Sequence, residues 1–299
     1  MKTNKTVLIV DGNNNLMRAY YKYINMTSKK GEPSNIVFGF PLMMGALVKK
    51  FKPDDMVVAF DSDRHKERYK LLPDYKKREK KIGFDYENFK EQNKIAVNTM
   101  TALGIKTLKV KGQEADDLIY LLVRHYKKLG YHKIIIASRD KDFRPLITSK
   151  VSIWVVTDDY LLTHKNHKQI IGWSPRQFLD YLILDGDKSD KIPGYPGFGE
   201  KTITTFLNEY SSIKNYLASG EQFRKVDNQL LEEIYNRNKM LIGIKQFVNT
   251  HLKDLKWKIK PGNKGIDYSY ISTISNRFDI NTFVDGKFIK TFKELANGK

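Results

Sequence analysis

Short apolar runs alternate with helical patterns over roughly the first 160 residues, and several of these runs end at an acidic residue. The run at residues 6–10 leads into Asp11, and the run at residues 56–60 leads into Asp61. Strands that alternate with helices are typical of a parallel sheet, whose strands all end at the same edge. The pattern therefore predicts an α/β fold, with a parallel central sheet flanked by helices and acidic side chains along its carboxyl edge.

Nine carboxylates are expected at or near this edge. They are Asp11, Asp61, Glu114, Asp116, Asp117, Asp140, Asp142, Asp187 and Asp190. On the helix that Glu114 opens, Glu114 and Asp117 are three residues apart and share a face. Two like charges about 4 Å apart repel by roughly 4 kcal/mol at an effective dielectric near 20. Because bound divalent cations are the usual remedy for such crowding, we expect a metal centre here.

The donor set indicates which metal the centre would take. The chain contains no cysteine, and its six histidines show no ligand spacing. Oxygen ligands alone favour Mg²⁺ or Mn²⁺ over zinc. Two or more such ions per site, roughly 4 Å apart, can activate a water and stabilise the leaving oxygen of a phosphodiester.

The rest of the chain is strongly basic, with 53 Lys and Arg against 34 Asp and Glu and a formal charge of +19. Such an excess favours a nucleic-acid partner. The segment 64–81 holds nine basic and three acidic side chains, with Tyr69 and Tyr75 among them. Basic side chains interleaved with aromatic ones suit a single-stranded backbone with bases free to stack. An acidic metal pocket on a basic body indicates an enzyme that cuts a polyanion.

Several classes of protein are excluded or disfavoured. No apolar run approaches the roughly 20 residues needed to cross a bilayer, and the run at residues 7–10 is too short for a signal-peptide core. The absence of cysteine excludes disulfides and thiolate sites and fits a reducing compartment. We expect a soluble, cytoplasmic monomer with no membrane partner.

After about residue 173 the sequence pattern changes. Ser174 and Pro175 start a helix through residue 184, and three glycines and two prolines between residues 193 and 199 forbid regular structure before a second helix at 202–210. Two helices joined by a glycine-rich turn form a helix–turn–helix-like hairpin. Its backbone amides and Lys201 can hold phosphates without reading bases.

Six segments occur in a fixed order that closely resembles one family. They are Val10-Asp11-Gly12-Asn13 with Arg18-Ala19-Tyr20, Phe60-Asp61, Leu72-Pro73-Asp74-Tyr75-Lys76, Glu114-Ala115-Asp116-Asp117, Asp140-Lys141-Asp142, and the long motif from Gly186 through Lys201-Thr202. Together they resemble the 5′-nuclease family of flap endonucleases and 5′→3′ exonucleases, which includes the 5′-nuclease domain of bacterial DNA polymerase I. The resemblance covers roughly residues 5–245, and we expect a stand-alone phage or bacterial member.

The resemblance implies a PIN-like nuclease domain with a helical arch, and a helix–three-turn–helix that grips duplex DNA. It also implies that the nine carboxylates bind the metals directly or through water. Lys76 matches the family's lysine beside the scissile phosphate, where a cation can offset developing charge. Arg18 and Tyr75 match neighbouring active-site positions. A K⁺ ion held by backbone carbonyls at the hairpin turn is a further expectation from the family.

The expected DNA contacts fall into two groups. The first is the basic segment, with Lys66, Arg68, Lys70, Lys77, Arg78, Lys80 and Lys81. The second is the hairpin, with Gly197, Gly199, Lys201 and Thr202. The expected substrate is DNA with a 5′ single-stranded flap or end next to duplex, met in replication, in primer or flap removal, or in repair.

The expected domain division is a PIN-like nuclease domain over residues 1–173, with the arch region at about 64–100. A helical DNA-binding subdomain follows over 174–299, with the helix–three-turn–helix at about 178–210. The sequence leaves two alternatives open: a PIN-type ribonuclease acting on RNA or RNA–DNA hybrids, and a non-catalytic DNA-binding protein. The expected location is the cytoplasm of a bacterium or of a phage-infected bacterial cell.

Overall fold

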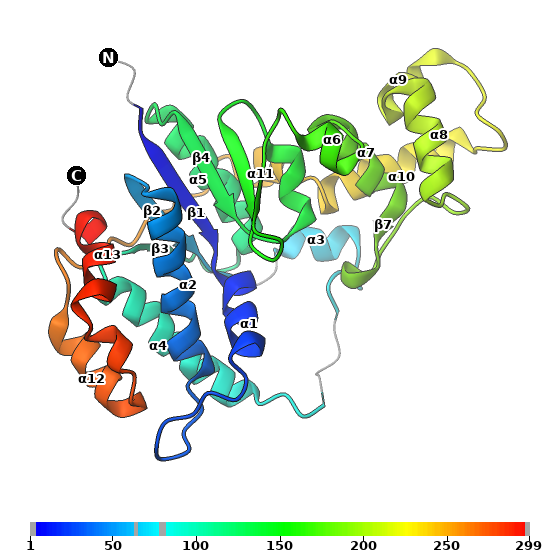
Figure 1. Ribbon diagram of the computed structural model, residues 1–299. Coiled ribbons are helices and arrows are strands. Elements are labelled where there is room, and N and C mark those ends of the chain that lie inside the picture. Colours follow the sequence, from blue (N-terminus) through cyan, green and yellow to red (C-terminus); the bar gives the residue numbers. More distant parts are fainter. Residues whose placement is uncertain (1–3, 63–64, 78–81, 297–299) are drawn as a thin grey trace.

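A six-stranded sheet forms the centre of the protein (Figure 1). The computed structural model describes residues 4–62, 65–77 and 82–296. The sheet order is β3-β2-β1-β4-β5-β6, and all neighbouring strands are parallel except β5 and β6, which are antiparallel. The strands are β1 (Thr6–Asp11), β2 (Asp55–Ala59), β3 (Lys106–Leu108), β4 (Lys133–Ala137), β5 (Val151–Val155) and β6 (Tyr160–Leu162). The prediction of an α/β fold with a mostly parallel sheet is confirmed.

Both faces of the sheet are buried, and side chains alternate between the two faces. In β1, Leu8 and Val10 enter one core cluster, whereas Val7 and Ile9 enter the other. Strands covered on both sides read as continuous apolar runs, which is why residues 6–10 carry no polar alternation. The helices α1 (Gly12–Lys22), α2 (Asn35–Phe51) and α4 (Tyr86–Ala102) supply the first cluster, and α5 (Ala115–Lys128) and α11 (Ile244–His251) supply the second.

The region of the expected arch contains the short helix α3 (Lys66–Leu71) and most of α4. Arg78, Lys80 and Lys81, which were expected to contact DNA, lie outside the described residues. The remaining short elements near the sheet are the 3₁₀ helix η1 (Lys141–Leu146), which follows β4, and α6 (His167–Ile171).

The helical hairpin lies where the glycine-rich motif predicted it. Its elements are α7 (Pro175–Asp185), the two-residue strands β7 (Gly186–Asp187) and β8 (Ile192–Pro193) with the 3₁₀ helix η2 (Lys188–Asp190) between them, and α8 (Glu200–Tyr210). A capping box of Ser174 and Gln177 begins α7. A side chain at Gly194 would meet the Leu184 carbonyl oxygen at 2.2 Å, so the turn requires glycine there. The helices α9 (Ile213–Ser219) and α10 (Asn228–Leu241) complete a separate apolar cluster with α8.

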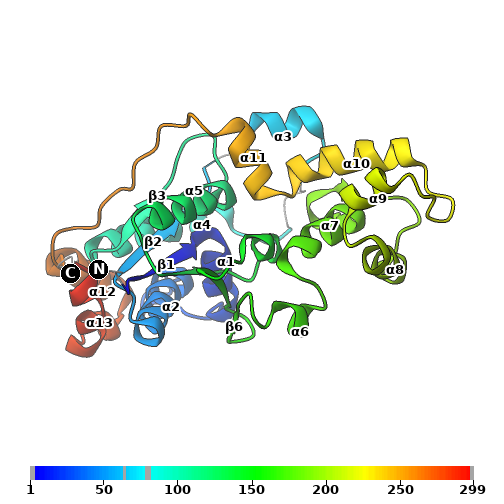
Figure 2. The same ribbon diagram turned by 90° about the horizontal axis from the view of Figure 1, so that it is seen from above.

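The last helices pack away from the hairpin. These are α12 (Tyr268–Phe278) and α13 (Gly286–Ala296), joined by the 3₁₀ helix η3 (Asn281–Phe283). They enter the core cluster of α2 and α4, at the opposite end of the molecule from α8 and α9 (Figures 1 and 2). The division at residue 173 stays a prediction, but residues 268–296 differ from the expected single helical subdomain because their apolar faces are buried against the first core.

Among the described residues, none of the helices combines the length and the apolar character needed to cross a membrane.

Asp180, on the buried side of α7, makes the fold sensitive to pH. Burial raises its pKa from the ordinary 3.8 to about 6, although the Ile213 N–H at the start of α9 opposes the shift. The protonated form therefore stabilises the fold below about pH 4, and this contribution is lost as the pH rises through about 6. We expect Asp180→Asn to raise the free energy of unfolding at pH 8 by up to about 3 kcal/mol, with no gain at pH 4.

Urea unfolding at the two pH values measures this difference, with Asp254→Asn, an exposed aspartate, as the matched control. An equal gain in the free energy of unfolding at pH 4 and pH 8 would contradict the raised pKa of Asp180.

Candidate metal centre

The strand-end acids meet at the carboxyl edge of the sheet, and neighbouring backbone fixes their orientation. Asp11 caps α1, accepting from the Asn14 N–H at 3.0 Å, and also accepts from the Ser138 hydroxyl at 2.8 Å. Asp61 accepts from the Ala115 N–H at the start of α5 at 2.6 Å. Loops after β1, β2 and β4 and the first turn of α5 are thereby held together.

Asp116 lies on the first turn of α5, among the same acids. Burial and the charges of Asp140, Asp11 and Asp61 raise its pKa well above the usual range, although Lys76 opposes the shift. Burial, with the charges of Asp140 and Asp61, raises the pKa of Asp11 to about 7. Buried carboxylates with raised pKa values are short of positive charge.

Glu114 and Asp117 share a helix face, as predicted, but an arginine occupies that face. Arg68 Nη1 and Nη2 donate to the two Asp117 carboxylate oxygens at 2.7 Å each, and Nη1 also donates to Glu114 Oε1 at 3.0 Å. Asp117 is fully buried, and both its oxygens are engaged. Its expected role as a metal ligand does not agree with this geometry, because the arginine takes the place of the metal.

The expected DNA contact of Arg68 is wrong for the same reason. Its side chain is only 2% exposed, and its guanidinium lies 3.8 Å from the centre of the Phe247 ring of α11. Burial disfavours the charged form, but Asp117 and Glu114 outweigh burial and raise the Arg68 pKa well above its ordinary value. Arg68 therefore joins α3 to α5 and α11. The sequence grouped Arg68 with the other basic residues of the segment, because charge density does not distinguish a buried cation from an exposed one.

Tyr75 and Lys76 close over Glu114 from the other side. Lys76 Nζ lies 2.5 Å from Glu114 Oε2, and the Tyr75 hydroxyl donates to the same oxygen at 3.2 Å. Despite burial, the charges of Arg68 and Lys76 lower the pKa of Glu114 to about 2. Arg18 is half-buried on α1, and within residues 4–62, 65–77 and 82–296 no side chain forms an ion pair with it.

A second group of acids comes from η1 and η2. Asp140 caps η1 by accepting from the Asp142 N–H at 2.9 Å, and Asp187 accepts from the Ser189 N–H at 2.8 Å. Lys141 approaches Asp187 at 3.3 Å from the solvent side. Burial and the charges of Asp140 and Asp187 raise the Asp142 pKa well above its usual range, and Asp142 Oδ1 is buried without a hydrogen-bond partner.

The chemistry of these acids decides whether they can hold metal ions. In the part of the chain that the structure describes, no three His, Asp or Glu side chains form a preorganised metal-binding site. The unpartnered Asp142 oxygen and the raised pKa values nevertheless mark a deficit of positive charge that a divalent cation would fill. All the donors are oxygens, which hard cations such as Mg²⁺, Mn²⁺ or Ca²⁺ prefer. The residues therefore fit a metal centre.

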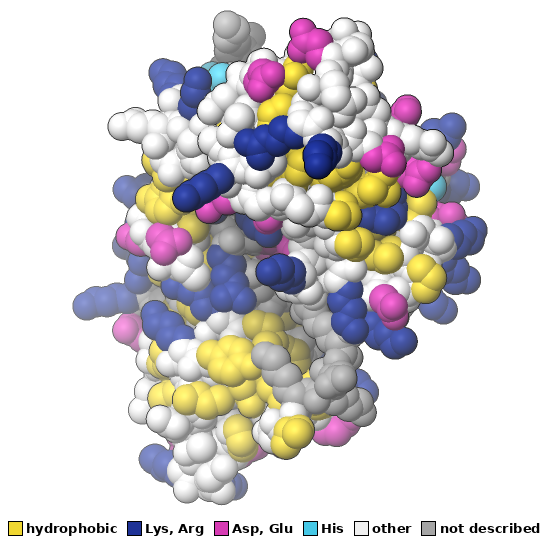
Figure 3. Space-filling view, turned by 90° about the vertical axis from the view of Figure 1, so that its right-hand side faces the viewer, with side chains coloured by type: hydrophobic (Ala, Val, Ile, Leu, Met, Phe, Trp, Pro, Cys, Tyr) yellow, Lys and Arg dark blue, Asp and Glu magenta, His cyan; other side chains and the backbone are white. Residues whose placement is uncertain are grey.

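Basic side chains surround this acidic edge. In Figure 3, Lys and Arg side chains flank a hollow across the middle of one face, and acidic atoms show inside it. Lys66, Lys70 and Lys77 are exposed, although Lys70 pairs with Glu67 and Lys77 with Asp74. At the hairpin, Gly197, Gly199 and Lys201 are exposed, and Gly199 begins α8 without a side-chain cap.

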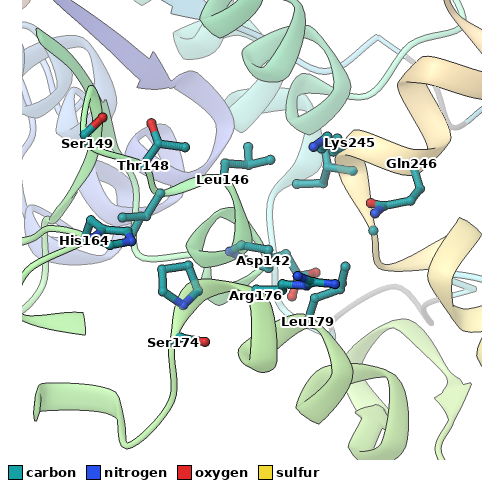
Figure 4. Close-up of a pocket in the computed structure, with 15 residues that line it drawn as sticks. Asp142, Leu146, Thr148, Ser149, His164, Ser174, Arg176, Leu179, Lys245 and Gln246 are labelled. Carbon is teal, nitrogen blue, oxygen red and sulfur yellow. The ribbon is translucent and has the colours of Figure 1, made fainter. Parts of the chain in front are cut away.

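Some residues near the site were missed by the sequence analysis. Ser138 bridges Asp11 and the Asp140 N–H, and a small polar residue directly after a buried strand was the available signal. Arg224 donates to Thr202 at 3.3 Å, with no local motif to reveal it. A pocket of about 870 Å³ opens beside Asp142, and Figure 4 shows Arg176 of α7 and Lys245 of α11 on its walls.

Two family descriptions match the chain: "5'-3' exonuclease, N-terminal resolvase-like domain" over residues 6–172, and "5'-3' exonuclease, C-terminal SAM fold" over residues 173–264. The 5'-3' exonuclease of Aquifex aeolicus is 31% identical over 86% of this chain and 87% of its own length. DNA polymerase I of Bacillus subtilis is 31% identical over 74% of this chain, but over only 25% of the polymerase.

Solved structures share the fold. A bacteriophage T5 flap endonuclease, in a pseudo-enzyme–product complex with DNA and metal ions, aligns with a TM-score of 0.69 at 21% identity, covering 98% of this chain and 99% of that chain. The T5 5'-exonuclease with divalent zinc ions bound aligns with a TM-score of 0.65 at 20% identity, covering 98% and 100%.

Arg68 is expected to be the main ion-pair contribution to stability near the site. Arg68→Met should lower the free energy of unfolding by about 3–5 kcal/mol, because Asp117 is then left buried without its partner. Chemical unfolding in metal-free buffer measures this loss. The control is Lys70→Met, which removes an exposed pair worth about 0–1 kcal/mol. Similar losses for the two variants would show that Arg68 does not hold α3 to α5.

Proposed function

The chain belongs to the 5'-3' exonuclease family, and from this premise we propose that it hydrolyses DNA with Mg²⁺ or Mn²⁺ at 5′ flaps, overhangs and nicks. The observation that carries the proposal is the gathering of carboxylates at one sheet edge. Asp11 and Asp190 are buried, Asp116, Asp140 and Asp142 are partly buried, and Asp61 is exposed. A phosphodiester approaching such an acidic edge is repelled unless cations lie between them. The basic hollow around the edge supplies long-range attraction for the same polyanion.

Eight of the nine carboxylates would hold the metal ions: Asp11, Asp61, Glu114, Asp116, Asp140, Asp142, Asp187 and Asp190. Asp117 would act through Arg68. Two ions bound there would activate a water and stabilise the leaving oxygen. Lys76, whose side chain is 19% exposed beside Glu114, offers an ammonium to the phosphoryl oxygens. Tyr75, which is 2% exposed, orients Glu114, and Arg18 offers a cation on the α1 side.

The hairpin would hold the duplex part of the substrate. Gly197 has a φ of 78°, which glycine adopts without strain, so the backbone can turn there and lie close to a phosphate. Gly199 leaves the first N–H groups of α8 open, and Lys201 and Thr202 follow on that helix. A K⁺ ion bound by the carbonyls of this turn belongs to the same proposal.

The proposed partner is DNA with a 5′ single-stranded end or flap next to duplex, bound by a monomer in the cytoplasm of a bacterium or phage-infected cell. The proposed role is primer or flap removal in replication, or repair. The related T5 flap endonuclease, whose structure contains DNA and metal ions, supports this choice of substrate.

With a 5′-labelled flap duplex and Mg²⁺, we expect cleavage near the junction of single strand and duplex. Excess EDTA should abolish it, because the buried acids then lack their cations. Mn²⁺ should restore activity after removal of EDTA. Denaturing gels of the mapped products provide the measurement, and an RNA flap of the same sequence distinguishes a ribonuclease. Cutting that persists in EDTA would refute the metal-dependent reaction.

The double variant Asp140→Asn with Asp142→Asn should lower the cleavage rate by at least about 10²-fold while duplex binding persists. Single-turnover kinetics and a binding titration in Ca²⁺ separate the two effects. Equal loss of binding and cleavage would point to misfolding, whereas cleavage at the wild-type rate would remove these aspartates from the metal centre.

Lys201→Ala should weaken duplex binding and lower the slope of log K against log salt by about one unit, because one phosphate contact is lost. Fluorescence anisotropy at several salt concentrations measures the slope. Lys128→Ala provides the matched control, since Lys128 is exposed at the far end of α5 from the acidic edge. An unchanged slope for Lys201→Ala would exclude Lys201 from the phosphate contacts.

A further inference from the structure

The ammonium of Lys76 lies among three of the acids that would hold metal. Its Nζ atom is 2.5 Å from Glu114 Oε2, 3.8 Å from Asp116 Oδ2 and 3.7 Å from Asp190 Oδ2. Two of these acids belong to the start of α5, and the third belongs to η2 in the hairpin region. One cation thus joins acids from two distant parts of the chain.

The backbone directs the Lys76 side chain to this place. Lys76 has a φ of 51°, in the left-handed region that residues other than glycine seldom adopt. Its N–H donates to the Asp190 carbonyl oxygen at 3.0 Å, so backbone and side chain both reach the same residue. An unfavourable backbone conformation persists only where surrounding contacts enforce it. Here the acids on either side enforce it.

A divalent ion and this ammonium cannot share the position. Mg²⁺ takes oxygen ligands at about 2.0–2.1 Å, and Mn²⁺ prefers the same oxygens. Because Nζ is 2.5 Å from Glu114 Oε2, an ion bound to that oxygen would lie within about 4.6 Å of the ammonium, so two cations would compete for one carboxylate oxygen. The Lys76 side chain is only 19% exposed, so water does little to screen the repulsion.

We propose that Lys76 is the internal counter-ion of the metal-free site, and that a divalent cation binds to Glu114, Asp116 and Asp190 only as the ammonium leaves. This rests on the proposed function, since it takes these acids as metal ligands. Metal binding is then an exchange of cations within the pocket. The displaced ammonium can then take a DNA phosphate as its partner, so metal loading prepares Lys76 for the substrate.

Lys141 offers a matched comparison on the other side of the same pocket. It approaches Asp187 at 3.3 Å, but its side chain is 40% exposed, and among the described residues it forms an ion pair with one acid rather than three. Removing its charge lowers the local positive charge by the same amount as removing that of Lys76. Removal of the Lys141 charge, however, does not vacate a buried position between carboxylates.

The test is a Mn²⁺ titration by calorimetry, without DNA, of wild type, Lys76→Met and Lys141→Met. Methionine keeps the length of the side chain but removes its charge. We expect the first Mn²⁺ ion to bind Lys76→Met on the order of tenfold more tightly than wild type, and Lys141→Met less than about threefold more tightly. Unchanged or weaker binding by Lys76→Met would overturn the proposal, as would equal gains for both variants.

A second measurement uses the wild-type protein and does not depend on a variant folding. Lysine acetylation, followed by mass spectrometry, should label Lys76 several-fold faster with saturating Mg²⁺ than without it, whereas the exposed Lys77 keeps a constant rate. An unchanged Lys76 rate would refute displacement. If wild type binds no divalent ion, the proposed function itself fails; if it binds normally and Lys76 responds to neither test, only this inference fails.

Discussion

Mutual repulsion among buried carboxylates is the constraint to which the rest of the site responds. Parallel strands end at one edge, so acids placed after them are brought together by the fold itself. The fold then supplies partners of three kinds: backbone N–H groups for Asp11 and Asp61, a buried guanidinium for Asp117 and an ammonium for Glu114. The acids with the most strongly raised pKa values are those whose charge is not fully compensated, and they are among the acids that we propose as metal ligands.

The ion pairs that compensate the carboxylate charges also join parts of the chain that have separate apolar cores. Arg68 joins α3 to α5 and, through the face of Phe247, to α11. Lys76 joins the segment after α3 to α5 and to η2. The sheet and the hairpin therefore meet across charges rather than only across apolar side chains. Electrostatic contacts of this kind respond to cations and to phosphate, which apolar packing does not.

Much of the fold could be predicted from the sequence because apolar runs, glycine-rich turns and strand-end acids are local signals. The positions of Asp11 and Asp61 follow from such signals, as does the hairpin. The burial of Arg68 could not be predicted from the sequence, because it depends on Asp117, 49 positions along the chain, and on Phe247. The packing of α12 and α13 was missed for a similar reason: an amphipathic helix shows that it has a buried face, but not which surface covers it.

The docking of α12 has a mechanical consequence. Arg277, near the end of α12, forms ion pairs with Glu91 on α4 and with Glu32 in the loop before α2. These ion pairs attach α12 to α4. On α3, Arg68 makes the corresponding contact by pairing with Asp117 of α5. Helices α3 and α4, which precede and follow residues 78–81 in the chain, are therefore each tied to the folded body by the ion pairs of an arginine.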